Sequence, residues 1–196
     1  VPLLGAQELQ LNPRLHHLFP SKPRDYLTDL AKIVKNPTDV NNRLREIREK
    51  EKLSLVAVTL PTLDGYAVED VAREIGRRWA VATAHDTIGA AVRNTGGVIL
   101  IVPESRDCRI EVATGSEGYM TDSRAGNACR EAARYFRIGD FEDGIVLIAD
   151  AFAQYHRREL ASQAEARRPR PPAKPLPWGI IIPLLGIFGV IVIFIF

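Results

Sequence analysis

The sequence has almost no net charge and very little cysteine, and each shortage excludes a class of protein. Its 26 lysines and arginines nearly balance its 24 acidic residues, for a formal charge of +2. So small an excess argues against nucleic acid as a partner. The two cysteines, Cys108 and Cys129, have neither a zinc-ligand spacing nor enough partners for a disulfide framework. We interpret them as small buried hydrophobic side chains, with a disulfide in an oxidising compartment as the alternative.

Charged residues are also missing from residues 178–196. This apolar stretch approaches the roughly 20 residues that a membrane-spanning helix needs. It therefore predicts one transmembrane helix, with Trp178 as an interfacial anchor. The preceding residues, 161–177, are basic and rich in proline, which predicts an extended linker. The side chains of this linker that we expect to contact anionic lipid headgroups are Arg167, Arg168, Arg170 and Lys174.

The sequence supports two orientations of this anchor. The basic linker favours the cytoplasm for the soluble part under the positive-inside rule. The apolar start VPLLGA, which begins at Val1, suggests that an upstream signal peptide was removed, although an ordinary mature terminus explains it equally well. We predict an extracytoplasmic, periplasmic domain, with a cytoplasmic, tail-anchored domain as the alternative.

The strongest strand pattern lies in the middle of the chain. Residues 98–102 are all apolar and lie between glycine and proline, which predicts a strand buried on both faces. In residues 108–112 apolar and polar side chains alternate, which predicts a second strand with one face on the core. These two strands are expected to form a hairpin, with residues 98–102 at the centre of the sheet.

Helical and strand patterns around the hairpin predict one α/β domain over residues 29–160. With 196 residues the chain is long enough for such a domain, with residues left over at both ends. A strand followed by a helix and another strand implies a crossover, so we expect a three-layer α/β/α sandwich around a small central sheet. The expected elements are a helix from Thr38, a strand over Leu53–Leu60, a helix from Val68 to Trp79, a loop over residues 80–95, a helix from Asp122 or Ser123 to Phe136, and a helix to about Leu160.

Proline interrupts every pattern before this domain, so residues 1–28 are predicted to be an extended arm. Its apolar side chains suit two interpretations: the arm lies on a partner, or it packs on its own domain. The pair His16-His17 has no carboxylate or cysteine at ligand spacing, which argues against a metal site there.

Several segments occur in an order that resembles the TPM domain family, whose founding members include a thylakoid-lumen protein and a photosystem II repair protein. They are LVAVTLP, the helix ending in Trp79, GGVILIV, RIEVATGSEGYMTD and FRIGDFEDGI. The resemblance covers about Asp29 to Ala151 and implies helices on both sides of a small sheet. The positions similar to the family's glycine and glutamate loop are Gly115, Glu117, Gly118 and Asp122, and those similar to its late Gly-Asp motif are Gly139, Asp140 and Gly144.

The resemblance implies two functions, a metal-dependent phosphatase and an assembly or maintenance factor of membrane complexes. For the phosphatase, the expected oxygen ligands of a calcium or magnesium ion are Glu117, Asp122 and Asp140, with Asp29 as a further candidate. However, Thr95-Gly96-Gly97 stands where family members commonly have Asp-Asn-Gly. We therefore assign no catalytic residue and no required cofactor.

The prediction is an accessory or assembly subunit that docks its domain on a larger integral-membrane complex, with metal-dependent phosphatase as the alternative. The resemblance suggests a photosynthetic reaction centre or photosystem as one such complex. The lipid bilayer is the other expected partner. The predicted span also offers small residues where a neighbouring helix can approach closely, Gly179, Gly186 and Gly189.

Overall fold

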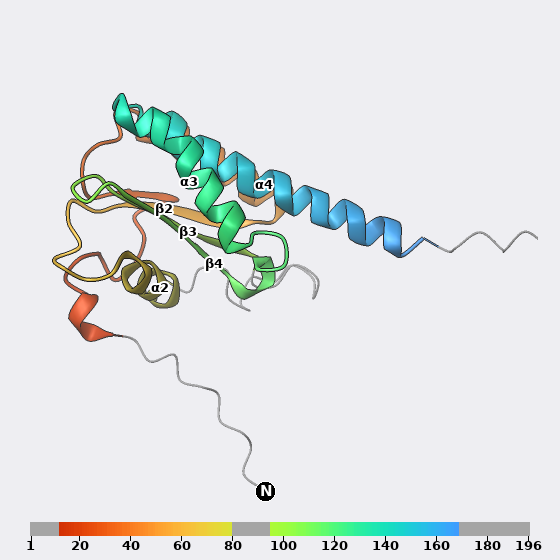
Figure 1. Ribbon diagram of the computed structural model, residues 1–196, viewed down its shortest axis with the longest axis horizontal. Coiled ribbons are helices and arrows are strands. Elements are labelled where there is room, and N and C mark those ends of the chain that lie inside the picture. The colour runs from red at the N-terminus through yellow and green to blue at the C-terminus, as the bar shows by residue number, and fades with distance from the viewer. Residues whose placement is uncertain (1–11, 80–94, 169–196) are drawn as a thin grey trace, which may run out of the picture. The chain divides into compact units, whose positions relative to one another are not determined.

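A computed structural model of the protein describes residues 12–79 and 95–168 (Figure 1). Within these ranges one sheet has the strand order β1-β2-β3-β4. β1, β2 and β3 run parallel, and β4 is antiparallel to β3. The strands are β1 Leu27–Asp29, β2 Ser54–Thr59, β3 Gly96–Val102 and β4 Asp107–Val112.

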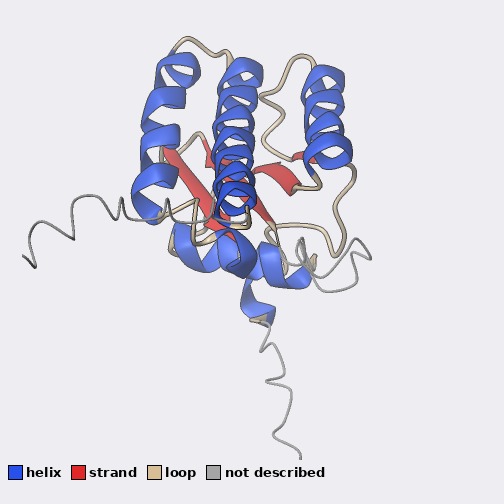
Figure 2. Ribbon diagram, turned by 90° about the vertical axis from the view of Figure 1, so that its right-hand side faces the viewer, coloured by secondary structure: helices blue, strands red, loops and turns tan. Residues whose placement is uncertain are grey.

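Helices cover both faces of this sheet, as Figure 2 shows. One face is covered by α1 (Pro37–Glu51), α3 (Asp122–Arg137) and α4 (Phe141–Ala166). The other face is covered by α2 (Val68–Arg78) and by the short 3₁₀ helix η1 (Pro13–Leu15). The predicted mixed α/β fold with a small central sheet is confirmed for the described residues.

The predicted hairpin is confirmed as β3 and β4, with β3 inside the sheet and β4 at its edge. Every residue of β3 is buried, whereas Ile110 is the only buried residue of β4. Because β3 has a helical layer on each side, apolar residues suit both of its faces. Ile99 and Ile110 are paired across the two strands on the side of α1, α3 and α4.

The described part of the predicted arm packs on its own domain, which was one of the two interpretations of its apolar side chains. Leu15 and Phe19 are buried in the apolar cluster beneath α2. The indole Nε1 of Trp79 donates a hydrogen bond of 2.8 Å to the carbonyl oxygen of Pro20. His16 Nε2 lies 2.9 Å from the carboxylate of the buried Glu74. Residues 12–28 are therefore part of the domain, and residues 1–11 lie outside the described ranges.

The interpretation of two unpaired cysteines is wrong, because Cys108 of β4 and Cys129 of α3 form a disulfide. Their Cα atoms lie 5.7 Å apart, within the usual range for a disulfide. The contact arises because α3 lies along β4, and the 21-residue separation gives no local sign of it.

The last helix continues past its predicted end at Leu160 to Ala166, so residues 161–166 are helical and not linker. Among the described residues, none of the helices has the length and apolar character needed to cross a bilayer. Arg168 forms an exposed ion pair of 3.0 Å with Glu165. The predicted span over 178–196, including Trp178, and the basic residues Arg170 and Lys174 lie outside the described part of the chain.

Candidate functional site

The loop that resembles the family's glycine and glutamate loop folds against the start of β3. The backbone N–H of Gly96 donates a hydrogen bond of 2.9 Å to Ser116 Oγ, and Ala113 N–H donates one of 2.9 Å to the carbonyl oxygen of Gly96. Ser116 Oγ is also 2.6 Å from the hydroxyl of Tyr119, and both side chains are buried. The structure thus brings together the two segments that the resemblance indicates.

Thr95 occupies the position where the family commonly has an acid. It is 7% exposed, and its hydroxyl donates a hydrogen bond of 3.3 Å to the carbonyl oxygen of Lys52, just after α1. A threonine hydroxyl is a weaker ligand for a hard cation than a carboxylate. Here that hydroxyl joins the start of β3 to the end of α1.

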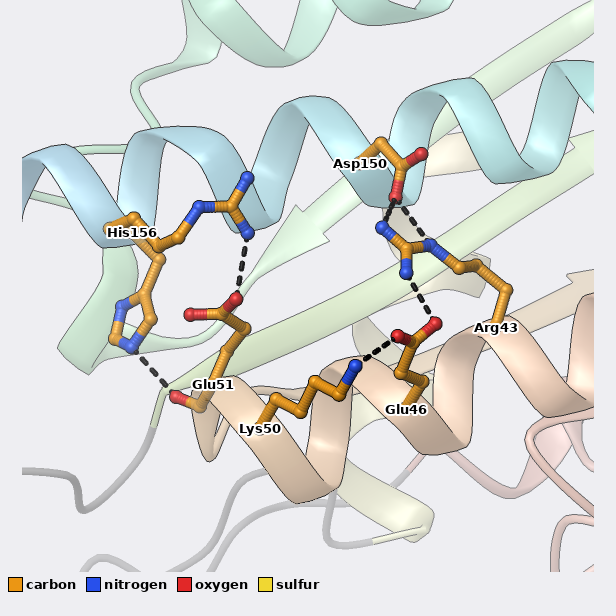
Figure 3. Close-up of polar contacts among 7 residues, drawn as sticks. Arg43, Glu46, Lys50, Glu51, Asp150 and His156 are labelled. Atoms are coloured by element: carbon orange, nitrogen blue, oxygen red, sulfur yellow. Dashed lines mark hydrogen bonds and ion pairs between the residues drawn. The ribbon is translucent and has the colours of Figure 1, made fainter.

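A buried histidine completes this polar cluster, and the sequence analysis missed it. His156 of α4 is 2% exposed, and its ring lies 5.1 Å from the ring of Tyr119. His156 Nε2 is 3.1 Å from the carbonyl oxygen of Glu51 (Figure 3), so Nε2 carries the proton and donates. Nδ1 is buried and has no hydrogen-bond partner among the described residues.

Burial keeps both rings of this cluster neutral. Desolvation lowers the pKa of His156, and the hydrogen bond to Glu51 only partly opposes it. Burial raises the pKa of Tyr119 to about 12, although its hydrogen bond with Ser116 acts in the opposite direction. The cluster therefore offers a neutral imidazole and a neutral phenol near neutral pH.

Ion pairs between α1 and α4 hold the two helices side by side at this point (Figure 3). Arg157 contacts Glu51 at 2.7 Å, and Arg43 contacts Asp150 at 2.6 Å. The Asp150 hydrogen bond raises the pKa of Arg43. These side chains are partly exposed, so each pair contributes little to stability. Their arrangement accounts for the position of His156 beside the last residue of α1.

The predicted metal ligands do not meet. Glu117 is exposed at the end of the 3₁₀ helix η2 (Thr114–Ser116), and Asp122 is 94% exposed at the start of α3. Asp140 lies beyond the other end of α3, where Oδ1 accepts a hydrogen bond of 3.2 Å from Asp143 N–H. A helix of this length places Asp122 and Asp140 roughly 24 Å apart. One ion cannot bind to both.

The carboxylate of Asp29, the further candidate ligand, accepts hydrogen bonds from neighbouring residues of the domain. It accepts them from the backbone N–H of Ile33 at 3.3 Å and of Val34 at 3.1 Å. It also accepts one from the hydroxyl of Thr59. These bonds close the turn after β1. Over residues 12–79 and 95–168, no group of three or more histidine, cysteine or acidic side chains is arranged to hold a metal ion.

The family match settles what this fold is. The TPM domain model matches residues 27–155. The chain belongs to the TPM domain family. No curated protein matches the sequence. Two solved structures are similar to this TPM domain. One is the solution structure of the N-terminal domain of a protein from P. gingivalis, with a TM-score of 0.58 and 27% identity over 69% of this chain and 84% of that one.

The second structure is the N-terminal domain of a protein from Corynebacterium glutamicum, with a TM-score of 0.50 and 17% identity. The match covers 67% of this chain and 79% of that one, and it shows the fold alone. Both structures are of the N-terminal domain of a longer protein.

The neutral state of His156 predicts a pH dependence of stability. Its pKa in the folded protein lies below the ordinary value of 6.5, so below pH 6.5 the unfolded chain takes up a proton that the folded domain does not. The free energy of unfolding therefore decreases as the pH falls from 6.5 toward the pKa of His156 in the folded domain, by at most about 1.4 kcal/mol per pH unit.

The measurement is the free energy of unfolding in urea between pH 7.5 and 5, for the wild type and His156→Gln. Glutamine keeps an N–H donor for the carbonyl of Glu51 but does not titrate. His16 and His17 are present in both proteins, so the difference between the two pH profiles isolates His156. Parallel profiles would show that His156 is not held neutral.

Proposed function

We propose that this protein is a membrane-anchored accessory subunit that docks its TPM domain on a larger membrane protein complex. One observation carries the proposal. At the family's acid position, Thr95 is buried and hydrogen-bonded to Lys52, while the remaining candidate carboxylates are spread over both ends of α3. This arrangement suits a domain that binds a protein partner. It does not suit an enzyme that must hold a cation for hydrolysis.

The disulfide supports an extracytoplasmic position for the domain. Disulfides persist in oxidising compartments such as the periplasm and are rare in the cytoplasm of most organisms. Cys108 and Cys129 are bonded across β4 and α3. Of the two orientations that the sequence allows, this feature favours the periplasmic one.

The anchor in this proposal is the uncharged segment 178–196, with Trp178 and the basic residues before it at the headgroups. A single span with three glycines would allow a second helix to approach it closely. The complex is thus an integral-membrane assembly, and a photosynthetic reaction centre is the example that the founding members of the family suggest.

The test is extraction of the full chain from its native membrane in a mild detergent, followed by affinity purification. We expect a stoichiometric membrane complex to co-purify, and to be lost when residues 178–196 are deleted. Recovery of the protein alone would contradict the proposal.

The same preparation tests the alternative function. We expect no hydrolysis of p-nitrophenyl phosphate with Mg²⁺ or Ca²⁺. Hydrolysis that Glu117→Gln or Asp140→Asn abolishes would instead establish a metal-dependent phosphatase.

A further inference from the structure

An open groove lies at the other end of β3 from the polar cluster. It has a cavity volume of about 930 Å³ and lies between the tip of the β3–β4 hairpin, the outer side of α3 and the start of α4. The volume is in the range of sites that hold a small ligand or a few side chains. We propose that this groove binds an acidic segment of a partner protein.

Three arginines make the groove basic. They come from separate segments: Arg106 from the hairpin tip, and Arg130 and Arg137 from α3. Asp107 is the one acidic residue of the lining, so the formal charges are three positive against one negative. Residues seven apart on a helix lie two turns apart on one face, which explains how Arg130 and Arg137 share the groove.

These arginines are available to a ligand. All three are exposed. In the described part of the chain, Arg106 and Arg137 form no ion pair, and the hydrogen bond of Arg130 goes to the neutral side chain of Asn127. Elsewhere on the domain, arginines such as Arg43 and Arg157 are paired with acids. An unpaired guanidinium binds a carboxylate through two parallel hydrogen bonds.

Most of the remaining lining is apolar. Phe136 and Phe141 are stacked, with ring centroids 5.4 Å apart and an interplanar angle of 17°. The disulfide between Cys108 and Cys129 also lines the groove and ties its strand side to its helix side. Arginine and aromatic side chains around one groove are typical of the centres of protein interfaces. They match a segment that carries aspartate or glutamate together with an apolar side chain.

An exposed isoleucine lies just after the end of α3. Ile138 is 77% exposed and directly follows Arg137. A bound segment would cover such a side chain.

The composition of the groove favours a protein segment over lipid headgroups. Its three arginines suit carboxylates, and the stacked rings of Phe136 and Phe141 beside them suit an apolar side chain of the same segment. The inference rests on the proposed function, because it names the surface by which the subunit would bind its complex.

The test uses the full chain in a neutral detergent and a fluorescein-labelled peptide of alternating glutamate and phenylalanine. Fluorescence anisotropy measures its affinity, with a glutamine-for-glutamate peptide as the comparison. The double variant Arg130→Glu/Arg137→Glu is expected to bind the acidic peptide at least about tenfold more weakly. The matched control is Arg134→Glu, an exposed arginine of the same helix that does not line the groove.

Equal affinity for the two peptides, or equal weakening by Arg134→Glu, would overturn the inference. So would displacement of the acidic peptide by phosphatidylserine in mixed micelles, because the groove would then be a lipid site. Circular dichroism checks that each variant is folded.

Co-purification separates this inference from the proposed function. If the complex co-purifies with both the wild type and the double variant, the groove inference is contradicted and the subunit proposal is supported. A complex lost only in the double variant supports both proposals. Peptide binding without any co-purifying complex supports the groove and contradicts the subunit proposal.

Discussion

Replacing Gly96 with alanine is expected to lower the free energy of unfolding by at least about 3 kcal/mol. Gly96 opens β3 with a φ of +147°, a conformation that residues with a side chain rarely adopt. A Cβ atom there would overlap the backbone carbonyl of Ser54 in β2. Neither strand can move easily, because the N–H of Gly96 is also bonded to Ser116.

Urea unfolding of the wild type, Gly96→Ala and Gly118→Ala measures this effect. Gly118 is the matched control, since a Cβ at that position meets no atom within 4 Å and its φ is ordinary. We expect Gly118→Ala to stay within about 0.5 kcal/mol of the wild type. A Gly96→Ala domain as stable as the Gly118→Ala domain would show that the start of β3 accepts a side chain.

Loss of the disulfide is expected to cost about 3 kcal/mol of stability. The bond closes a loop over a sequence separation of 21 residues, and the estimate follows from the entropy that this loop removes from the unfolded chain. The measurement is urea unfolding with and without a phosphine reductant. Because the sequence has two cysteines, a reductant can act on no other bond of the protein.

The variant Cys108→Ala/Cys129→Ala provides the control for this measurement. It should match the reduced wild type in stability and should not respond to the reductant. Iodoacetamide should add no mass to the folded wild type before reduction. Alkylation of either cysteine in the untreated folded protein would contradict the bond.

The sequence predicted the centre of this fold well because local pattern and burial agree there. Residues 98–102 are apolar without interruption, and β3 is indeed covered on both sides. β1 was missed for the opposite reason. Leu27–Asp29 is short and follows two prolines, and its partner is β2, reached only after all of α1. A strand that depends on so distant a partner has no local signature.

The candidate site was predictable only where neighbouring sequence carries it. The segment around Gly96 and the loop around Ser116 were indicated by the resemblance, and they are hydrogen-bonded to each other. His156 was missed because it lies on the apolar side of a long helix among ordinary core positions. Its hydrogen bond goes to the backbone of Glu51, which no sequence pattern reports.

The groove was missed because its side chains come from the hairpin tip, α3 and the start of α4. One signal was present in the sequence. Gly126, Arg130, Ala133 and Arg137 recur at helical spacing. This stripe is small and basic, whereas the adjacent, buried stripe of the helix is small and apolar. Two different stripes on one helix indicate two different neighbours.

The N-terminal segment beneath α2 belongs to the folded domain but lies outside the residues that match the family. The family match begins at residue 27, yet Leu15 and Phe19 are buried core residues, and Trp79 is bonded to Pro20. A fragment trimmed to the family boundary would keep all four strands but lose the buried Leu15 and Phe19 and the hydrogen bond to Trp79. The folded domain therefore starts well before the region that matches the family.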